Sequence, residues 1–455
     1  MGDYLIVGGG ITGLAAAWEA SGRGHRVSVV EESARLGGKV RSEVRSGCLV
    51  EHGPDSFVTY RPAVLELVAE LGMSDQVISV TEPRVVNLRV RGRMQPLPDG
   101  MGLVLPTRLA PFARTRIISW PQKARAGLDL VLPRVLSDAD MAIGEILRRR
   151  LGPAIVASFA DPLLGGLYGT SVDELSIDAV LPSLRSSEAQ HRSLMLASLA
   201  QGRAARGRPP GSPFRSLQGG MGSLVDALSG ALSNRQVELR TGVQASGLRL
   251  GRSGLEVELG DGTFRRPDGV VLACGARPAA DLVDQVSPEA ASGLRSIPHR
   301  STAVVTLGFH AEAFRDAPIG HGYLEAGPQW APVSGVTLSS NKWAGRAPQG
   351  VVLLRAFVPD RVGPLGDDTD ERILEAVVDH IGKVLGAPDP HLRHIVRWRD
   401  CMPSYVVGHR QRVLAVERAL RLVGPVRVAG SAVNGVGVPD CIADGRRVAA
   451  ELAGA

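Results

Sequence analysis

The chain has 455 residues, of which 44% are hydrophobic and 22% are charged. This composition excludes a disordered, coiled-coil or fibrous protein, and the length suits two or three packed domains that can enclose a large ligand. Lysine and arginine number 52 against 46 aspartates and glutamates, and the net charge of +6 is spread along the chain. That spread favours anionic partners only weakly, and we expect no nucleic-acid partner.

The cysteines lie far apart without a CxxC pair, so we predict neither a zinc site nor a disulfide framework, and no metal. The first strand is predicted to begin at about Asp3, which leaves no room for a signal peptide. No run of about 18 uncharged apolar residues occurs. We therefore expect a cytoplasmic protein that does not span a membrane.

The first 31 residues are typical of the opening βαβ unit of a nucleotide-binding fold. Residues 4–7 form an apolar strand, residues 11–20 a helix, and residues 27–30 a β-branched second strand. A G-x-G-x-x-G motif follows the first strand and opens the helix. The order of these elements predicts a parallel sheet with a bound nucleotide at its edge.

Each glycine of the motif has a physical role in such a site. Gly8 allows the turn, Gly10 lets backbone amides approach a pyrophosphate, and Gly13 permits close helix packing. The helix N-terminus then stabilises the phosphate charge. Glu31 ends the second strand, where a carboxylate can accept the ribose hydroxyl protons. The predicted cofactor contacts of this unit are Gly8, Gly10, Ile11, Thr12, Gly13, Glu31 and Glu32.

The rest of the chain alternates between helical and strand-like stretches. Residues 106–211 are the most helical part, and residues 202–213 are predicted to form an exposed loop. Further helices are expected at residues 62–72, 223–232, 369–385 and from about 440. Further strands are expected within residues 77–97, 237–239, 255–259, 270–274, 301–309, 333–340, 351–358 and 426–429.

Two other glycine segments resemble the flavin amine oxidase and desaturase superfamily. Residues 35–39, Arg-Leu-Gly-Gly-Lys, resemble its second glycine motif, in which the glycines let the chain pass close to an extended FAD. A solvated turn is the alternative. Residues 219–222, Gly-Gly-Met-Gly, resemble the motif that opens the second section of the FAD domain. The resemblance implies FAD contacts by Arg35, Gly37, Gly38, Lys39 and Val243.

Four longer stretches resemble one branch of this superfamily, the porphyrinogen oxidases. They are residues 51–57, residues 162–194, the Cys-Met-Pro-Ser-Tyr motif at 401–405 with Gly408 and His409, and residues 430–442. A helix N-terminus after the last glycines would stabilise negative charge on the reduced flavin. The resemblance adds FAD contacts by Gly53, Pro54, Asp55, Ser56, Trp398, Gly430, Val436, Gly437 and Val438.

The resemblance implies oxidation of a porphyrinogen to a porphyrin in haem biosynthesis, by three hydride transfers to FAD with release of hydrogen peroxide. A methylene bridge between pyrroles is electron-rich, so we assign no catalytic acid or base. Substrate contacts are predicted for Gly166, Leu167, Tyr168, His321 and Leu324. A helix-packing role for Gly166 is the alternative, and Trp398 could equally be a core residue.

The substrate within the family is predicted from two departures from the mitochondrial and plastid type. Gly102 stands where those enzymes carry a propionate-binding arginine, and His321 where they carry a phenylalanine. Residues 102–112 and 339–343 resemble the Gram-positive type, so coproporphyrinogen III is favoured over protoporphyrinogen IX. The remaining alternatives are a flavin amine oxidase or desaturase, and a flavin-binding protein without turnover.

The predicted fold is α/β, with a discontinuous Rossmann-like FAD-binding domain, a mixed-sheet substrate domain and a helical domain. The three comprise residues 1–60, 216–297 and 396–455, residues 61–105 and 298–395, and residues 106–215. The predicted partners are a porphyrinogen and molecular oxygen. In the family the helical region touches membranes, whereas here an ordinary domain helix is the alternative. A transient contact with the next haem-pathway enzyme is a further expectation, and both monomer and homodimer stay open.

Overall fold

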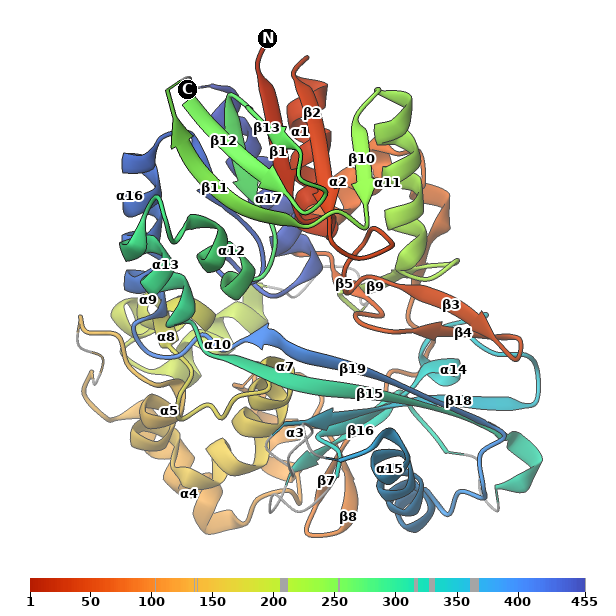
Figure 1. Ribbon diagram of the computed structural model, residues 1–455. Helices are drawn as coiled ribbons and strands as arrows, with labels where there is room; N and C mark the ends of the chain where they lie inside the picture. Colours follow the sequence, from red (N-terminus) through yellow and green to blue (C-terminus); the bar gives the residue numbers. More distant parts are fainter. Residues whose placement is uncertain are drawn as a thin grey trace. The chain divides into compact units, whose positions relative to one another are not determined.

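The computed structural model describes residues 1–102, 104–134, 136, 138–204, 212–252, 254–314, 318–326, 332–360 and 368–454. The chain divides into two compact units, each assembled from separate segments (Figure 1). Unit 1 comprises Met1–Val80, Pro213–Pro298 and Arg410–Ala455, and unit 2 comprises Thr81–Ser212 and His299–His409. The predicted α/β class is confirmed. The residue boundaries of the three predicted domains stay a prediction.

Unit 1 is built on a five-stranded parallel sheet with the order β10-β2-β1-β14-β20. Its strands are β1 (Asp3–Val7), β2 (Arg26–Glu31), β10 (Glu238–Thr241), β14 (Gly269–Leu272) and β20 (Val426–Val428). Side chains alternate between the two faces: Tyr4 and Ile6 join one apolar core, and Leu5 and Val7 join the other. Both faces are therefore covered, which explains the continuous apolar runs of these strands.

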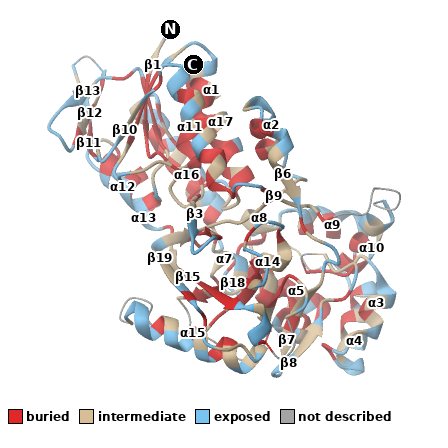
Figure 2. Ribbon diagram, turned by 90° about the vertical axis from the view of Figure 1, so that its right-hand side faces the viewer, coloured by how far each residue is buried: buried red, intermediate tan, exposed pale blue. Residues whose placement is uncertain are grey.

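Each face of this sheet has its own covering layer, and the buried residues of both layers are red in Figure 2. One core includes side chains from α1 (Ile11–Gly22), α2 (Ala63–Glu70), α11 (Gly222–Asn234) and α17 (Val438–Ala453). The other core includes β11 (Ala245–Gly251), β12 (Gly254–Leu259), α12 (Ala276–Val283), α13 (Pro288–Arg295) and α16 (His409–Val423). Strand β13 (Phe264–Arg265) pairs with β12.

Two small sheets complete unit 1. The hairpin of β3 (Ser42–Arg45) and β4 (Cys48–Glu51) follows the second glycine motif. Strands β5 (Phe57–Val58) and β6 (Val77–Ser79) both pair with β9 (Phe214–Leu217), and η1 (Ser74–Gln76) precedes β6. These pairings join the segment before the helical region to the segment after it.

Unit 2 contains a mixed seven-stranded sheet with the order β19-β15-β18-β17-β16-β7-β8. The strands are β19 (Leu392–Pro403), β15 (His299–His310), β18 (Val351–Pro359), β17 (Gly335–Leu338), β16 (Gly322–Ala326), β7 (Val86–Val90) and β8 (Arg93–Pro96). Only the β16–β7 pairing is parallel. Helix α15 (Asp370–Leu385) packs Ile373, Val377 and Ile381 into the core on one face of this sheet.

The helical part of unit 2 has its own apolar core, which includes Leu88 of β7 and Ala326 of β16. Its segments are α3 (Leu109–Arg114), α4 (Trp120–Gly127), η2 (Leu128–Leu130), α5 (Ile143–Leu151), α6 (Pro153–Ile155), η3 (Val156–Gly165), α7 (Gly166–Tyr168), α8 (Ile177–Val180), α9 (Ser183–His191) and α10 (Leu194–Ala204). Segment η3 is a π-helix that contains Pro162. A proline lacks an amide hydrogen and disturbs regular α-helical bonding, which explains a local change of helix type here.

The structure corrects several sequence predictions. The strand expected at residues 333–340 ends at Leu338, where the short helix α14 (Ser339–Lys342) begins. Strand β19 was missed because both of its faces carry polar residues, and α16 was missed although its apolar residues recur at helical spacing. The segment after His310 forms η4 (Ala311–Ala313). Most of the loop predicted at 202–213 lies outside the described residues. Among the described residues, no helix is long and apolar enough to cross a membrane.

Candidate cofactor and substrate sites

The three motif glycines of unit 1 meet different surroundings. A Cβ on Gly13 would lie 1.9 Å from the Gly8 carbonyl oxygen, and a Cβ on Gly8 would lie 2.8 Å from the backbone of Ala273. A Cβ on Gly10, by contrast, would have no described atom within 4 Å. Gly10 is also the N-cap of α1, where none of the described side chains caps the helix. The open space at Gly10 therefore faces uncapped amides of a helix N-terminus, as a bound pyrophosphate requires.

Glu31 lies at the end of β2, as predicted, and its carboxylate is bonded to the glycine turn. The Gly9 amide donates to Glu31 Oε2 (2.7 Å), and the amide and hydroxyl of Ser33 donate to Oε1 (3.0 and 2.6 Å). A carboxylate has about four acceptor positions, so capacity for a ribose hydroxyl remains. The Val243 amide donates to the Glu31 carbonyl (2.9 Å), which places the predicted adenine contact beside it. The neighbouring Glu32 is exposed.

The second glycine motif lies directly against the first. The Gly37 amide donates to the Gly9 carbonyl (2.8 Å), and Gly10 and Gly37 form an isolated parallel bridge. A Cβ on Gly38 would lie 3.3 Å from the Gly10 Cα atom. Arg35 donates to the carbonyls of Leu36 and Gly38 (3.1 and 2.7 Å), so its guanidinium holds the loop itself. A phosphate contact of Arg35 or Lys39 stays a prediction.

The segment containing Gly53, Pro54, Asp55 and Ser56 passes close to the same loop. A Cβ on Gly53 would lie 2.1 Å from the Lys39 carbonyl oxygen. The Ser56 hydroxyl donates to Asp55 Oδ1 (2.6 Å), and the Ser216 hydroxyl donates to the Asp55 carbonyl (2.7 Å). Three predicted cofactor segments from the first 60 residues are thus adjacent in unit 1.

The C-terminal glycines reach the first helix from the other end of the chain. Gly430 has φ +105°, and a Cβ there would lie 2.9 Å from Oγ1 of Thr12, in the first turn of α1. The Gly430 amide donates to Asp444 Oδ2 (2.8 Å). Gly437 is the N-cap of α17, between Val436 and Val438, and the carboxylate of Asp440 in the first turn accepts its amide hydrogen bond. A contact of this helix N-terminus with the reduced flavin stays a prediction.

These observations together test whether FAD fits unit 1. The open space beside Gly10, the carboxylate of Glu31, the adjacent glycine loops and the N-terminus of α1 form a cradle suited to a dinucleotide. The predicted contact Ile11 is buried at the start of α1. Trp398 is the one predicted cofactor contact in unit 2, where it lies on β19 opposite Thr302. The individual FAD contacts stay predictions.

The predicted substrate residue Leu324 shares one face of the unit 2 sheet with Trp398. Leu324 is opposite Gly335, Gly335 is opposite Phe357, and the same face continues through Val304 to β19. The other face carries Leu354 and Ala356 and packs with α15. Because residues directly opposite one another point to the same side, Leu324 and Trp398 emerge away from α15.

His321 does not follow this alternation, because the next residue, Gly322, has φ +137°. Its ring is buried, and Nε2 lies 3.2 Å from the Thr81 hydroxyl oxygen. Burial lowers the pKa of His321 below its ordinary value. The imidazole is therefore neutral at neutral pH and does not supply a cation for a carboxylate.

Gly166, Leu167 and Tyr168 form the short helix α7 directly after the π-helix. A Cβ on Gly166 would have no neighbour within 4 Å in the described chain, whereas a Cβ on Gly165 would lie 2.8 Å from Asp161 Oδ1. The close packing anticipated for Gly166 is therefore found at Gly165, while Gly166 borders open space. The Leu167 side chain is 55% exposed. A π-helix often marks a functional segment, and only Pro162 signalled it in the sequence.

The segments at 162–194 and 401–409 contact each other within unit 2. The hydroxyl oxygens of Thr170 and Ser404 are 2.5 Å apart, and Leu175 forms an isolated antiparallel β-bridge with Val406. The Tyr405 ring stacks on His409 at 4.0 Å between centroids, and Tyr168 lies 6.1 Å from Tyr405. The two stretches that resemble porphyrinogen oxidases thus pack against each other next to α7, the helix that contains Gly166.

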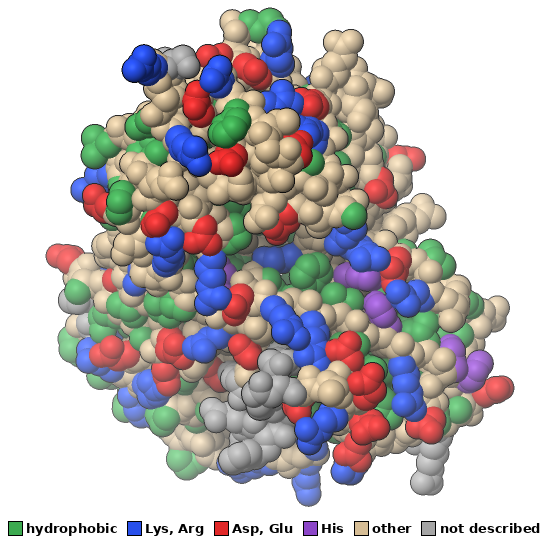
Figure 3. All heavy atoms as spheres, in the orientation of Figure 1, with side chains coloured by type: hydrophobic (Ala, Val, Ile, Leu, Met, Phe, Trp, Pro, Cys, Tyr) green, Lys and Arg blue, Asp and Glu red, His purple; other side chains and the backbone are tan. Residues whose placement is uncertain are grey.

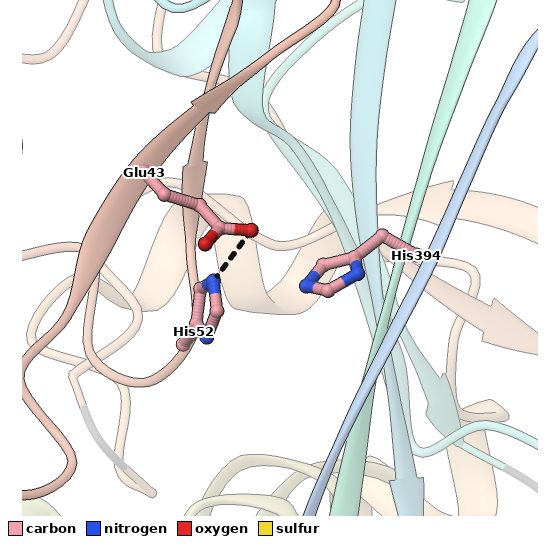
Figure 4. A group of neighbouring side chains, drawn as sticks. All are labelled: Glu43, His52 and His394. Carbon is pink, nitrogen blue, oxygen red and sulfur yellow. Dashed lines mark ion pairs between the residues drawn. The ribbon is translucent and has the colours of Figure 1, made fainter. Parts of the chain in front are cut away.

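Sequence reasoning missed two groups of paired charges that involve buried side chains. In unit 2 the fully buried Arg150 pairs with Asp129 and with Glu188 (Nη1 to Oε1, 2.8 Å). In unit 1 the β3–β4 hairpin carries an ion pair between Glu43 and the buried His52 (Oε1 to Nε2, 3.2 Å), drawn in Figure 4. Burial raises the pKa of Glu43, but the bonds from Arg45 and His52 outweigh it and hold that pKa at about 2.

The surface carries both signs of charge in close proximity. On the face drawn in Figure 3, Lys and Arg side chains are interspersed with Asp and Glu. Exposed ion pairs of the chain include Arg249 with Glu258 and Arg266 with Glu256 (both 2.8 Å). Exposed apolar side chains occur in the helical part of unit 2 at Leu109, Trp120, Leu128, Leu130 and Val131.

Comparison with known proteins identifies the family. The family model described as flavin containing amine oxidoreductase matches residues 11–453. Coproporphyrinogen III oxidase from Propionibacterium freudenreichii subsp. freudenreichii is 51% identical over 98% of this chain and 90% of the relative. Protoporphyrinogen oxidase from Homo sapiens is 31% identical over 99% of this chain and 98% of the relative.

A solved structure extends the comparison to the fold. A crystal structure from Exiguobacterium sp. 255-15, whose assignment as a protoporphyrinogen oxidase is provisional, matches with a TM-score of 0.87 and 28% identity. The match covers 99% of this chain and 98% of that chain. A family model that spans nearly the whole sequence, relatives of similar length and a shared fold agree. The chain therefore belongs to the family of flavin-containing amine oxidoreductases.

Proposed function

We propose that this chain oxidises coproporphyrinogen III to coproporphyrin III in haem biosynthesis, with FAD as cofactor and oxygen as electron acceptor. The observation that carries the proposal is the 51% identity, across 98% of the chain, to a relative with that name. The proposal is supported by the cradle of glycines in unit 1 and by the open space beside Gly166 in unit 2. Oxidation of protoporphyrinogen IX is the alternative.

The overall reaction removes six hydrogen atoms from the macrocycle. Four of these hydrogens come from the four meso carbons and two from pyrrole nitrogens. In each of three steps a meso carbon loses a hydride and the macrocycle loses a proton; two of the three protons leave from nitrogen and one from the fourth meso carbon. FAD, when bound, supplies the two-electron acceptor for each hydride. Three oxygen molecules take up the electrons and protons and leave as three molecules of hydrogen peroxide, so atoms and electrons balance.

The chain's own residues bind and orient rather than exchange protons. The N-terminus of α1 at Gly10 stabilises the pyrophosphate charge, and Glu31 accepts ribose hydroxyl protons. Gly166 leaves room for a flat macrocycle because a side chain there would project into open space. No protein acid or base is assigned, since the methylene bridge is already electron-rich.

The preference for coproporphyrinogen III rests on Gly102 and His321. The Gly102 amide donates to the Leu105 carbonyl (2.9 Å), and a Cβ on Gly102 would lie 3.0 Å from that carbonyl oxygen. A side chain at this place would require that carbonyl to shift by a few tenths of an ångström. His321 is buried and neutral, so it provides a flat ring rather than a positive charge.

The proposal is tested with the purified protein and equal concentrations of coproporphyrinogen III and protoporphyrinogen IX in air. Porphyrin fluorescence and hydrogen peroxide are recorded together. We expect faster formation of coproporphyrin, with three peroxide molecules for each porphyrin. Faster protoporphyrin formation would favour the alternative substrate, and oxidation of neither would exclude the proposed function.

We further propose a peripheral membrane contact through Leu109, Trp120, Leu128 and Val131. These apolar side chains are exposed on α3, α4 and the segment around η2, and Lys123 lies over the Trp120 ring at 4.5 Å. Aromatic and cationic side chains favour a membrane interface. Co-sedimentation with anionic phosphatidylglycerol vesicles is expected for the wild type and should fall for Trp120→Ser; sedimentation unchanged by this variant would contradict the proposed surface.

A further inference from the structure

Glu51 is a buried carboxylate at the end of β4 that the proposed chemistry does not use. Its side chain is 2% exposed. Oε1 accepts the Met221 amide (2.8 Å), and Oε2 accepts the Ser42 hydroxyl (2.6 Å). Ser42 is also the residue directly opposite Glu51 in the β3–β4 hairpin. Hydrogen bonds to a charged acceptor are stronger than those between neutral groups, so these two bonds attach Glu51 firmly to Met221 and Ser42.

The same two side chains accept hydrogen bonds from amides at the N-terminus of α11. The Gly222 amide donates to the Ser42 hydroxyl oxygen (2.8 Å), next to the Met221 amide that donates to Glu51. A negative charge at a helix N-terminus is stabilised by the amides and by the helix dipole. Gly220 has φ +85°, and a Cβ there would lie 2.4 Å from the Ser42 hydroxyl oxygen. The glycine motif at 219–222 thus accommodates the protein's own carboxylate at this helix end.

This attachment lies at the base of two predicted cofactor loops. Lys39 precedes Ser42 by three residues, and Gly53 follows Glu51 by two. Between the strands and the loops, the His52 amide donates to the Arg41 carbonyl (2.9 Å), and Gly53 packs on the Lys39 carbonyl. A movement of the hairpin base would therefore displace both loops together.

Helix α11 provides the fixed side of the attachment. Its residues Leu224, Val225, Leu228 and Leu232 belong to the unit 1 core. A Cβ on Gly37 would lie 2.9 Å from Cγ1 of Val225, so the second glycine loop also packs directly on this helix. Glu51 and Ser42 thus connect the hairpin base to a helix that is anchored in the core.

We propose that Glu51, with Ser42, is a positioning residue for the FAD. It acts through the loops containing Gly37, Gly38 and Gly53, which it holds in the arrangement that binds the cofactor, and it does not itself touch the cofactor. The inference rests on the FAD contacts that belong to the proposed function. Part of the FAD affinity of unit 1 then depends on the buried carboxylate of Glu51.

The test titrates apoprotein with FAD, following flavin fluorescence, and measures the melting temperature of each apoprotein separately. Glu51→Ala is expected to raise the dissociation constant of FAD at least tenfold. The control is Glu70→Ala. Glu70, on α2, also accepts several hydrogen bonds in unit 1, but its side chain is 42% exposed. These bonds come from Trp18 of α1 (2.6 Å) and Arg446 of α17 (2.8 and 2.7 Å) rather than from either loop.

A purely structural role would lower the melting temperature of both apoproteins and leave both FAD affinities alike. Equal dissociation constants for Glu51→Ala and Glu70→Ala would therefore overturn the inference. Glu51→Gln keeps the shape and one acceptor oxygen, so it should recover part of the lost affinity. Failure of Glu51→Gln to bind FAD better than Glu51→Ala would also count against it.

If Glu51→Ala does not fold, Ser42→Ala gives a milder test. It removes one hydroxyl from the attachment and should weaken FAD binding severalfold, and unchanged affinity would refute the inference. The titration does not depend on turnover. Wild-type protein that binds FAD but oxidises no porphyrinogen would exclude the proposed function while leaving the role of Glu51 intact.

Discussion

Replacing Gly10 and Gly13 separately by alanine should separate cofactor binding from folding. At Gly10 the new methyl group would enter open space, and the backbone angles of −69° and 173° suit any residue. At Gly13 it would lie 1.9 Å from the Gly8 carbonyl oxygen, so the helix or the turn must move by about 1.5 Å or more to reach an ordinary contact of about 3.5 Å.

The sizes of the two effects follow from these distances. Gly13→Ala gains at most about 1 kcal/mol from helix propensity, whereas overpacking a backbone contact costs about 1–3 kcal/mol or more. The unfolding free energy should therefore fall, and the apoprotein should melt roughly 2–10 °C lower. Gly10→Ala should change the unfolding free energy by less than about 0.5 kcal/mol. Its methyl group occupies the proposed pyrophosphate space, so FAD should bind at least about tenfold more weakly, which is about 1.4 kcal/mol.

Two assays on the same preparations distinguish these effects. Thermal unfolding of each apoprotein reports the packing, and titration with FAD reports the site. Gly10→Ala with wild-type FAD affinity would refute the assignment of the α1 N-terminus to the pyrophosphate. Gly13→Ala with a wild-type melting temperature would refute the close approach of Gly13 to Gly8.

Three further predictions concern Gly166, Arg150 and Glu43. Gly166→Phe should abolish porphyrinogen turnover while the protein keeps its FAD, as measured by porphyrin fluorescence and flavin absorbance; normal turnover would contradict the substrate contact proposed for Gly166. Arg150→Met should lower the unfolding free energy by about 3–5 kcal/mol, because Asp129 and Glu188 stay buried without their cation, and chemical denaturation showing a loss below about 1 kcal/mol would contradict this. The pKa of Glu43 is held at about 2, below its ordinary 4.5, so its stabilisation is fully present above pH 4.5 and is lost as the pH falls towards 2. The melting temperature of Glu43→Gln should accordingly lie below that of the wild type at pH 6 and approach it near pH 2, and a constant difference would disprove the assignment.

The sequence was most informative where the chemistry is local. The strand at residues 4–7, the glycine turn and the helix from Ile11 were predicted because periodicity and glycine spacing are properties of adjacent residues. The same holds for α15, predicted at 369–385 and found at Asp370–Leu385. The sequence-based prediction failed at Ser339, where the apolar run suggested that the strand continues but helix α14 begins.

The sequence by itself determined the family, the α/β class, the cofactor type and the segments to be examined for its site. Only the tertiary structure decided how those segments meet. It placed Gly37 against Gly10, Gly430 against Thr12, and Glu51 at the start of α11. It also identified Gly165, not Gly166, as the closely packed glycine. The physical reason is that close approach and burial depend on residues distant in the chain, so the role of a glycine or a carboxylate is set by neighbours that local sequence patterns do not reveal.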